Sequence, residues 1–162
     1  MTSLAPASHV SEDVSYLFDH NGLVLKSRMS AALAEIGLTP RMHCVLVHAL
    51  EEERTQNQLA EIGDMDKTTM VVTVDALERA GLAERRPSSR DRRARVIAVT
   101  EEGAKVAAKS QEIVDSVHGE VLGALPEDER AVFLRAMHRL ATGLLAEPVA
   151  SAATRRTRER AL

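Results

Sequence analysis

Arginine side chains gather in one short segment of this chain of 162 residues. Between Arg85 and Arg95 there are six arginines and one acid, Asp91, a local formal charge of +5 in a chain whose formal net charge is −3. A guanidinium group stays charged and donates hydrogen bonds to phosphate oxygens through a planar fork. The segment therefore indicates contact with a polyanion, and the alternative is a basic face that meets only solvent.

Cys44 and His48 form a second group with chemical potential. They are four residues apart, which places both side chains on one face of a helix. A neighbouring imidazolium would lower the pKa of the thiol and make it reactive. The simpler interpretation is a small buried cysteine in the apolar run 44–47, beside a hydrogen-bonded histidine.

An enzyme built on Cys44 is not expected. It would need a base, an orienting group and an oxyanion site near the thiol, whereas the sequence offers only His48 and no glycine-rich turn. The six histidines form no H-x-x-x-H pair, so we expect neither a metal site nor another cofactor. The single cysteine excludes an intrachain disulfide and is typical of a reducing cytoplasm.

Apolar periodicity predicts long helices at both ends of the chain, at about residues 12–36, 100–125 and 126–145. No apolar run approaches the ~18 residues that would suggest a membrane span. Residues 1–9 lack the pattern of a signal peptide. We therefore expect a cytoplasmic protein with no membrane partner.

A shorter helix is expected at about residues 39–50. Pro40 lies in its first turn, where a missing N–H has no helical partner to lose. The acidic triplet at residues 51–53 is interpreted as its solvated end.

Two further short helices are joined by a tight turn at residues 63–65. Thr55 and Gln58 form a capping box that starts the first, and its buried side is expected at Leu59, Ala60 and Ile62. Asp66 is expected to cap the second, which runs over about residues 67–80. The second helix should bury Met70, Val71, Val74 and Leu77, and place Lys67, Thr68, Thr69, Thr73 and Arg79 largely elsewhere.

The period changes after Gly81, and a β-hairpin is predicted. Residues 82–86 form a short extended run, residues 87–91 have turn chemistry, and residues 93–99 are rich in β-formers. The arginine segment therefore lies at the tip of this hairpin.

The predicted order is a helix, a turn, a second helix and then a basic hairpin. The second helix of such a pair fits the major groove of duplex DNA, ~12 Å wide, and its first residues meet base edges. Hairpin arginines would reach the backbone or the neighbouring minor groove. Aromatic residues make up only 2% of the chain, too few for the stacking platforms of single-strand and RNA binders. Double-stranded DNA is therefore the expected partner.

The segment from Asp66 to Gly103 resembles the MarR family of winged helix-turn-helix transcriptional regulators. Asp91-Arg92-Arg93-Ala94 with residues 96–103 is similar to the family's wing, and residues 66–85 are similar to its recognition helix and first wing strand. The likeness extends in element order over about residues 12–145. It implies a mainly α fold with a small β-hairpin wing, in a bacterial regulator. A repressor is the preferred interpretation, although the sequence does not separate it from an activator.

The resemblance also implies a homodimer. The helices at residues 1–38 and 101–147 would interlock, because three long helices carry more apolar surface than one small domain covers. Residues 39–100 would form the winged helix-turn-helix domain, and residues 148–162 a flexible basic tail. A two-fold dimer implies a pseudo-palindromic operator whose half-sites are ~34–36 Å apart.

The expected DNA contacts lie on the helix pair and the wing, where Asp91 resembles the family's acid that orients an arginine. The candidates are Gln58, Lys67, Thr68, Thr69, Thr73, Arg86, Arg90, Asp91, Arg92 and Arg93.

The signal that switches such a regulator is left open by the sequence. The resemblance implies a small molecule, an oxidised cysteine or zinc, but peroxide-sensing relatives carry their cysteine early in the first helix, where this chain has none. Glu35, His43 and His118 would converge in a zinc-binding relative. The candidates for a small-molecule pocket are His20, Arg41, Met42, Cys44 and His48, of which His20 and Arg41 would meet an anionic ligand.

Overall fold

The computed structural model describes residues 13–91 and 93–149 of the chain. It divides into two compact units, the first ending at His118 and the second beginning at Gly119. The division lies within the long helix Glu101–Gly123. Over the described ranges, no helix is both long and apolar enough to cross a membrane.

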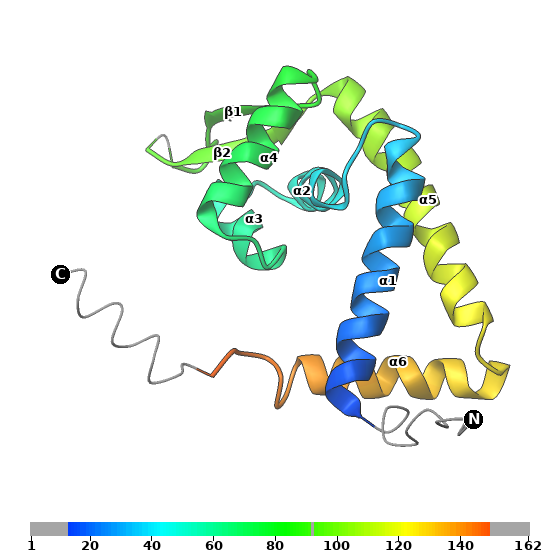
Figure 1. Ribbon diagram of the computed structural model, residues 1–162. Helices are drawn as coiled ribbons and strands as arrows, with labels where there is room; N and C mark the ends of the chain where they lie inside the picture. The colour runs from blue at the N-terminus through cyan, green and yellow to red at the C-terminus, as the bar shows by residue number, and fades with distance from the viewer. Residues whose placement is uncertain (1–12, 92, 150–162) are drawn as a thin grey trace, which may run out of the picture. The chain divides into compact units, whose positions relative to one another are not determined.

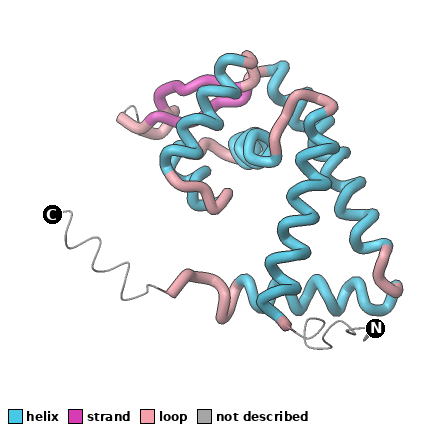
Figure 2. Tube along the Cα trace, viewed as in Figure 1, coloured by secondary structure: helices cyan, strands magenta, loops and turns pink. Residues whose placement is uncertain are grey.

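The fold is mainly α-helical with one small β-hairpin, as the sequence predicts (Figure 1 and Figure 2). In chain order the elements are α1 (Val14–Ala34), α2 (Pro40–Glu51), α3 (Gln56–Ile62), α4 (Lys67–Arg79), β1 (Ala83–Pro87), β2 (Arg95–Val99), α5 (Glu101–Gly123) and α6 (Glu127–Ala141).

The three short helices begin where the sequence predicts, because a polar side chain caps each one. Thr39 caps α2. Thr55 and Gln58 cap α3 reciprocally: the Gln58 N–H donates to Thr55 Oγ1 at 3.3 Å, and the Thr55 N–H donates to Gln58 Oε1 at 2.8 Å. Asp66 caps α4, since Oδ1 accepts from the Thr69 N–H at 2.8 Å. Each cap satisfies N–H groups that the first helical turn leaves unpaired.

Apolar stripes of the helices and the hairpin meet in the core of the first unit. Its fully buried side chains include Leu33, Val45, Leu46, Leu59, Met70, Val74, Leu77 and Ile97. On α4 the buried positions 70, 73, 74 and 77 recur at helical spacing. This helix therefore fixes one face in the core and turns the opposite face to solvent.

Three side-chain positions expected from the sequence are wrong. Ile62 and Val71, expected in the core, are 42% and 41% exposed, and Thr73, expected outside it, is 6% exposed. Thr73 tolerates burial because its hydroxyl donates to the Thr69 carbonyl at 2.8 Å. Once Thr73 completes the buried stripe, Val71 lies beyond its edge.

The hairpin follows α4 directly. Gly81, at φ +69°, turns the chain from α4 into β1, which pairs antiparallel with β2. The segment before α3 also joins the sheet, because the Ile97 N–H donates to the Arg54 carbonyl at 3.1 Å. The hairpin is thereby fixed to the start of the helix-turn-helix.

The second unit contains the end of α5 and α6. Acids in the first turn of α6 and basic side chains in its last turn both complement the helix dipole. No residue of α6 is buried, and five large apolar side chains are 38–55% exposed: Val132, Phe133, Leu134, Met137 and Leu140. α6 ends at Ala141, short of the predicted end near Leu145. The unit thus presents an apolar helix that nothing within the described chain buries.

Candidate nucleic-acid interface

The solvent face of α4 begins with two of the residues for which base contacts are predicted. Lys67 and Thr68 are exposed in its first turn. Val71 and Val72 follow, 41% and 59% exposed. Residues near the start of a recognition helix meet base edges, and the structure leaves this predicted part of α4 open to solvent.

Thr69 and Thr73 have structural contacts instead. The Thr69 hydroxyl donates to Asp66 Oδ2 at 2.6 Å. This bond, with those from backbone N–H groups, holds the pKa of the Asp66 carboxyl below its usual value, so the cap stays charged. Thr69 therefore belongs to the cap of α4, and Thr73 to its buried stripe.

Gln58 is exposed, but its side-chain oxygen is used locally. Oε1 accepts from the N–H of Thr55 at 2.8 Å and from its hydroxyl at 3.0 Å. The predicted DNA contact of Gln58 would therefore be made by its side-chain NH₂.

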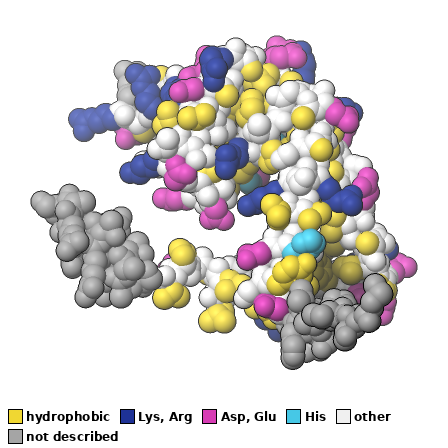
Figure 3. Space-filling view, viewed as in Figure 1, with side chains coloured by type: hydrophobic (Ala, Val, Ile, Leu, Met, Phe, Trp, Pro, Cys, Tyr) yellow, Lys and Arg dark blue, Asp and Glu magenta, His cyan; other side chains and the backbone are white. Residues whose placement is uncertain are grey.

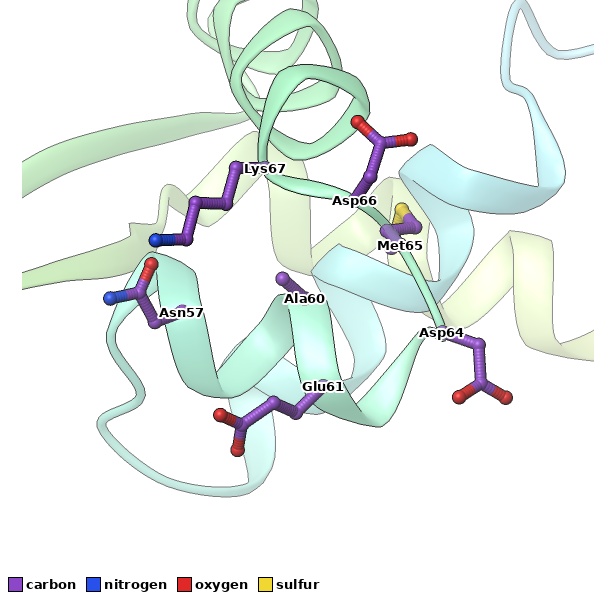
Figure 4. Close-up of a pocket in the computed structure, with 7 residues that line it drawn as sticks. All are labelled: Asn57, Ala60, Glu61, Asp64, Met65, Asp66 and Lys67. Atoms are coloured by element: carbon purple, nitrogen blue, oxygen red, sulfur yellow. The ribbon is translucent and has the colours of Figure 1, made fainter. Parts of the chain in front are cut away.

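A shallow open depression lies at the turn between α3 and α4 (Figure 4). It is lined by Asn57, Ala60, Glu61, Asp64, Met65, Asp66 and Lys67. Figure 4 shows Asn57 and Lys67 on the same side of it and Asp64 on the opposite side. Three acids against one lysine make this depression unsuited to an anion, so it is not a phosphate site.

The arginines of the wing point into solvent. Arg86, Arg90, Arg93 and Arg95 are exposed. Figure 3 shows basic side chains at the tip of the hairpin. Arg92, the remaining predicted contact, lies outside the described residues. The wing thus offers cations to phosphate oxygens from several positions.

Asp91 shapes the tip of the wing. Its carboxylate accepts from the backbone N–H of Arg93 at 2.9 Å, and its carbonyl accepts from the Ala94 N–H at 2.9 Å. These bonds form a tight turn that sets the direction in which the chain leaves Arg93. Asp91 therefore acts on the backbone of the wing.

Glu53 anchors the wing from the end of α2, which the sequence did not predict. Its carboxylate accepts from the Ser88 and Ser89 hydroxyls, both at 2.9 Å, and from the Ser89 N–H at 3.2 Å. The two hydroxyl bonds lower the pKa of the Glu53 carboxyl. The expectation that residues 51–53 are only a solvated end is therefore wrong for Glu53. Its two partners are 35 and 36 residues away, beyond the reach of any local pattern.

Arg85 forms ion pairs with two acids, so its charge is not part of the unpaired basic surface of the wing. Its guanidinium pairs with Asp75 at 2.7 Å and with Glu78, and its Nε donates to Gln56 at 3.2 Å. The bonds join β1 to α3 and α4. The basic tip therefore begins at Arg86, and the sequence showed nothing of this role because the partners of Arg85 lie on two other elements, α3 and α4.

Cys44 is not activated. Burial raises the pKa of its thiol, and the nearby Asp64 carboxylate raises it further. His48, expected to lower that pKa, pairs with Glu51 instead, with 3.2 Å between Nδ1 and Oε2. The reactive-thiol interpretation is therefore wrong for this structure, and a half-buried structural cysteine fits.

His43 is the buried histidine of the first unit. Its Nδ1 lies 2.7 Å from Ser110 Oγ, and the Ser110 hydroxyl donates its one proton to the Ala107 carbonyl at 2.8 Å. The His43 Nδ1–H must therefore be the donor. Burial lowers the pKa of His43, with His48 adding to the effect, so the ring is neutral at physiological pH.

The residues suggested for a metal do not form a site, and those suggested for a ligand differ in burial. Among the described residues there is no group of three His, Cys, Asp or Glu side chains able to hold a metal ion, so Glu35, His43 and His118 do not converge. His20 is exposed and stacks on Tyr16, with ring centroids 5.3 Å apart. Arg41 is exposed, whereas Met42 is 9% exposed and lies in the core.

Comparisons with known proteins agree with this geometry. A model of the MarR family matches residues 36–94. CouR from Rhodococcus jostii RHA1, in a crystal structure with p-coumaroyl-CoA, is 30% identical to this chain, covers 92% of it and 99% of its own length, and gives a TM-score of 0.75. A MarR-family transcriptional regulator from Rhodococcus sp. RHA1 is 28% identical over 83% of this chain and 96% of its own, with a TM-score of 0.74. The transcriptional repressor CouR bound to a 23-mer DNA duplex is 26% identical over 86% of this chain and 99% of its own, with a TM-score of 0.76.

A helix-turn-helix followed by a basic hairpin defines a winged-helix protein of the DNA-binding class. The chain belongs to the MarR family of transcriptional regulators. The proteins that it resembles are regulators of transcription and not enzymes.

Proposed function

We propose that this protein is a homodimeric transcriptional repressor that binds a pseudo-palindromic operator in the bacterial cytoplasm. One observation carries the proposal: the exposed start of α4 and the basic tip of the hairpin belong to two elements that Arg85 ties together, because its guanidinium on β1 pairs with Asp75 and Glu78 of α4. A helix in the major groove and a wing on the flanking backbone need this fixed relation. The CouR complex with a DNA duplex supports this use of the fold.

The proposed DNA contacts are those predicted residues whose side chains reach solvent. They are Gln58, Lys67, Thr68, Arg86, Arg90 and Arg93, with Arg92 kept from the sequence alone. Asp91 shapes the wing and Thr69 caps α4. Thr73 leaves the set because its hydroxyl is buried and bonded.

Arg93→Ala tests the role of the wing. The duplex to use is one that the wild-type protein selects from a library of random duplexes. Each phosphate contact adds ~0.9 to the dependence of log affinity on log salt, so losing one from each subunit should lower that slope by ~2. Fluorescence anisotropy at several salt concentrations measures it. Lys109→Ala is the matched control, since it removes an equal charge from α5 and should leave the slope unchanged. Equal slopes for Arg93→Ala and wild type would contradict the proposal.

We place the dimer contacts in the helices at residues 1–38 and 101–147, and DNA binding in residues 39–100. The exposed apolar side chains of α6 support this division, because water contact with such a surface is unfavourable. Light scattering should give twice the chain mass of 17.6 kDa at micromolar concentration. A stable monomer there would overturn the architecture.

A small molecule is the proposed signal for release from DNA. CouR, seen with p-coumaroyl-CoA, supports a ligand-responsive regulator, and the residues to test remain His20, Arg41, Met42, Cys44 and His48. The raised pKa of Cys44 disfavours the thiol-responsive alternative. Adding p-coumaroyl-CoA to the protein–DNA complex should lower its anisotropy if the effector is a related acyl thioester. No change would remove that class of ligand.

A further inference from the structure

Two adjacent valines lie in the middle of the exposed face of α4. Val71 is 41% and Val72 59% exposed. With Thr68 and Asp75 they follow the spacing of one helical face, opposite the stripe that α4 buries. The helix therefore has one apolar surface in the core and a second, smaller one in solvent.

Neither helix stability nor core packing explains this pair. A β-branched side chain loses rotamer freedom in a helix and stabilises it less than alanine does. Single exposed apolar residues are common on proteins, but these two are adjacent and lie at the centre of the proposed reading face. Their surroundings are basic, with Lys67 and Arg79 exposed on the same helix and Arg86 exposed on the wing.

An apolar centre within a basic surround matches the major groove of DNA. Phosphates line the edges of the groove, and inside it the C5-methyl of thymine is the group that makes apolar contacts. Asp75, the acid on this face, has one carboxylate oxygen held by Arg85 at 2.7 Å, which leaves only the other to accept from a cytosine amino group. The centre of the face is thus suited to methyl groups and less to hydrogen-bonded readout.

We propose that Val71 and Val72 contact thymine C5-methyl groups in each half-site and thereby select T·A pairs. The inference rests on the proposed function, since α4 must lie in the major groove. A protein partner would be the other occupant of an apolar helix face, and the surrounding cations favour DNA.

Replacing thymine by deoxyuridine removes only the methyl group and tests the contact directly. The probe is again the duplex that the wild-type protein selects from a random library, with each thymine replaced in turn at one fixed salt concentration. Burial of one methyl group corresponds to about a fourfold change in affinity. We expect a loss of about fourfold at one or two thymines of each half-site, and little change elsewhere.

The same probes are then measured with Val71→Ala and Val72→Ala. These variants should fold, because alanine favours the helix and neither valine is in the core. They should bind the thymine duplex more weakly and show no further loss with deoxyuridine, because the contact is already gone. Arg93→Ala is the matched control: it should weaken binding to both duplexes by one common factor. Circular dichroism melting checks that the variants are folded.

The outcomes separate the inference from the function beneath it. Selection of a sequence together with a deoxyuridine loss that the valine variants abolish supports both. Selection of a sequence with no deoxyuridine effect, or with an equal effect in all variants, overturns the valine contact and leaves the regulator intact. Failure to select any duplex sequence overturns the proposed function and the inference with it.

Discussion

The two parts of the proposed DNA surface are held in place by different kinds of interaction. α4 is fixed by an apolar stripe, in which Met70, Val74 and Leu77 are 1% exposed or less. The hairpin also buries apolar side chains, Ala83 and Ile97, but polar groups add to its anchoring, with Glu53 at its tip and Arg85 at its base. The reading helix is therefore positioned by burial, whereas the tip of the wing depends on polar and charged contacts as well.

This difference predicts how each part responds to its surroundings. Apolar burial depends little on salt or pH, whereas ion pairs between partly exposed groups are screened by salt and lost on titration. The reading helix should keep its place under conditions that loosen the wing. Variants that remove one kind of contact at a time test this difference.

Leu77→Ala should have the largest effect, because it empties a site in the core stripe of α4. Removing a fully buried leucine side chain typically destabilises a domain by about 3 kcal/mol. Urea unfolding followed by circular dichroism measures the loss. Val72→Ala, on the exposed face of the same helix, should change the stability by less than about 0.5 kcal/mol. Similar losses in the two variants would mean that α4 is not anchored by its buried face.

The caps of α3 and α4, Gly81 and the hairpin were all predictable, because their signals lie within a few residues of one another. Thr55 with Gln58 and Asp66 with Thr69 are three residues apart, and each pair forms the bond that its types favour. Local chemistry of this kind survives folding almost unchanged.

The polar contacts that hold the wing were not predictable. The bond from Ser88 to Glu53 spans 35 residues and that from Arg85 to Gln56 spans 29. A sequence pattern shows which residues are charged or polar, but not which of them form ion pairs or hydrogen bonds with one another. The burial of Thr73 was also missed. A threonine can be buried when its hydroxyl donates to a carbonyl of its own helix, and the residue type alone does not show whether it does so.

Arg85→Ala should have the next largest effect. It leaves Asp75 and Glu78 beside each other without their shared cation and releases β1 from α3. We expect a loss of about 1 kcal/mol, small because these groups are partly exposed. The loss should shrink in high salt, unlike that of Leu77→Ala. A loss that does not depend on salt would show that packing of the arginine stem, and not its charge, holds the base of the hairpin.

Glu53→Ala should loosen the tip of the wing while α4 is unaffected. The variant removes the acceptor for the Ser88 and Ser89 hydroxyls and for the Ser89 N–H. Hydrogen exchange should become faster for residues 87–91 and stay unchanged for residues 70–77. Glu52→Ala is the matched control, because Glu52 pairs with Arg54 and does not contact the wing. Faster exchange in α4 would remove the distinction between the two parts.

As the pH falls, protonation of His43 should destabilise the core before protonation of Glu53 loosens the wing. The pKa of Glu53 is lowered, so its contribution persists as pH falls and is lost only below the usual carboxyl range, about 4.5. The pKa of His43 is also lowered, but a histidine with a lowered pKa opposes folding when it is protonated. The unfolded chain then binds more protons than the folded one from about pH 6.5 downward.

The stability of the wild-type protein should therefore decrease between about pH 7.5 and about pH 5.5. His48 adds to the unfavourable charge around His43 and so does His118, whereas Asp115 offsets it, so the expected decrease is the smallest effect among these predictions. His43→Asn keeps a donor near Ser110 but does not titrate, and it should reduce this pH dependence. His48→Gln should reduce the pH dependence by less, since His48 acts on the pKa of His43 only through its charge. Urea unfolding at the two pH values gives the comparison, and the protection of residues 87–91 against hydrogen exchange, relative to the intrinsic rate at each pH, should stay constant over the same range. If the wing loosens first, Glu53 is a weaker anchor than its hydrogen bonds indicate, and polar contacts are then the first part of this surface to fail in acid.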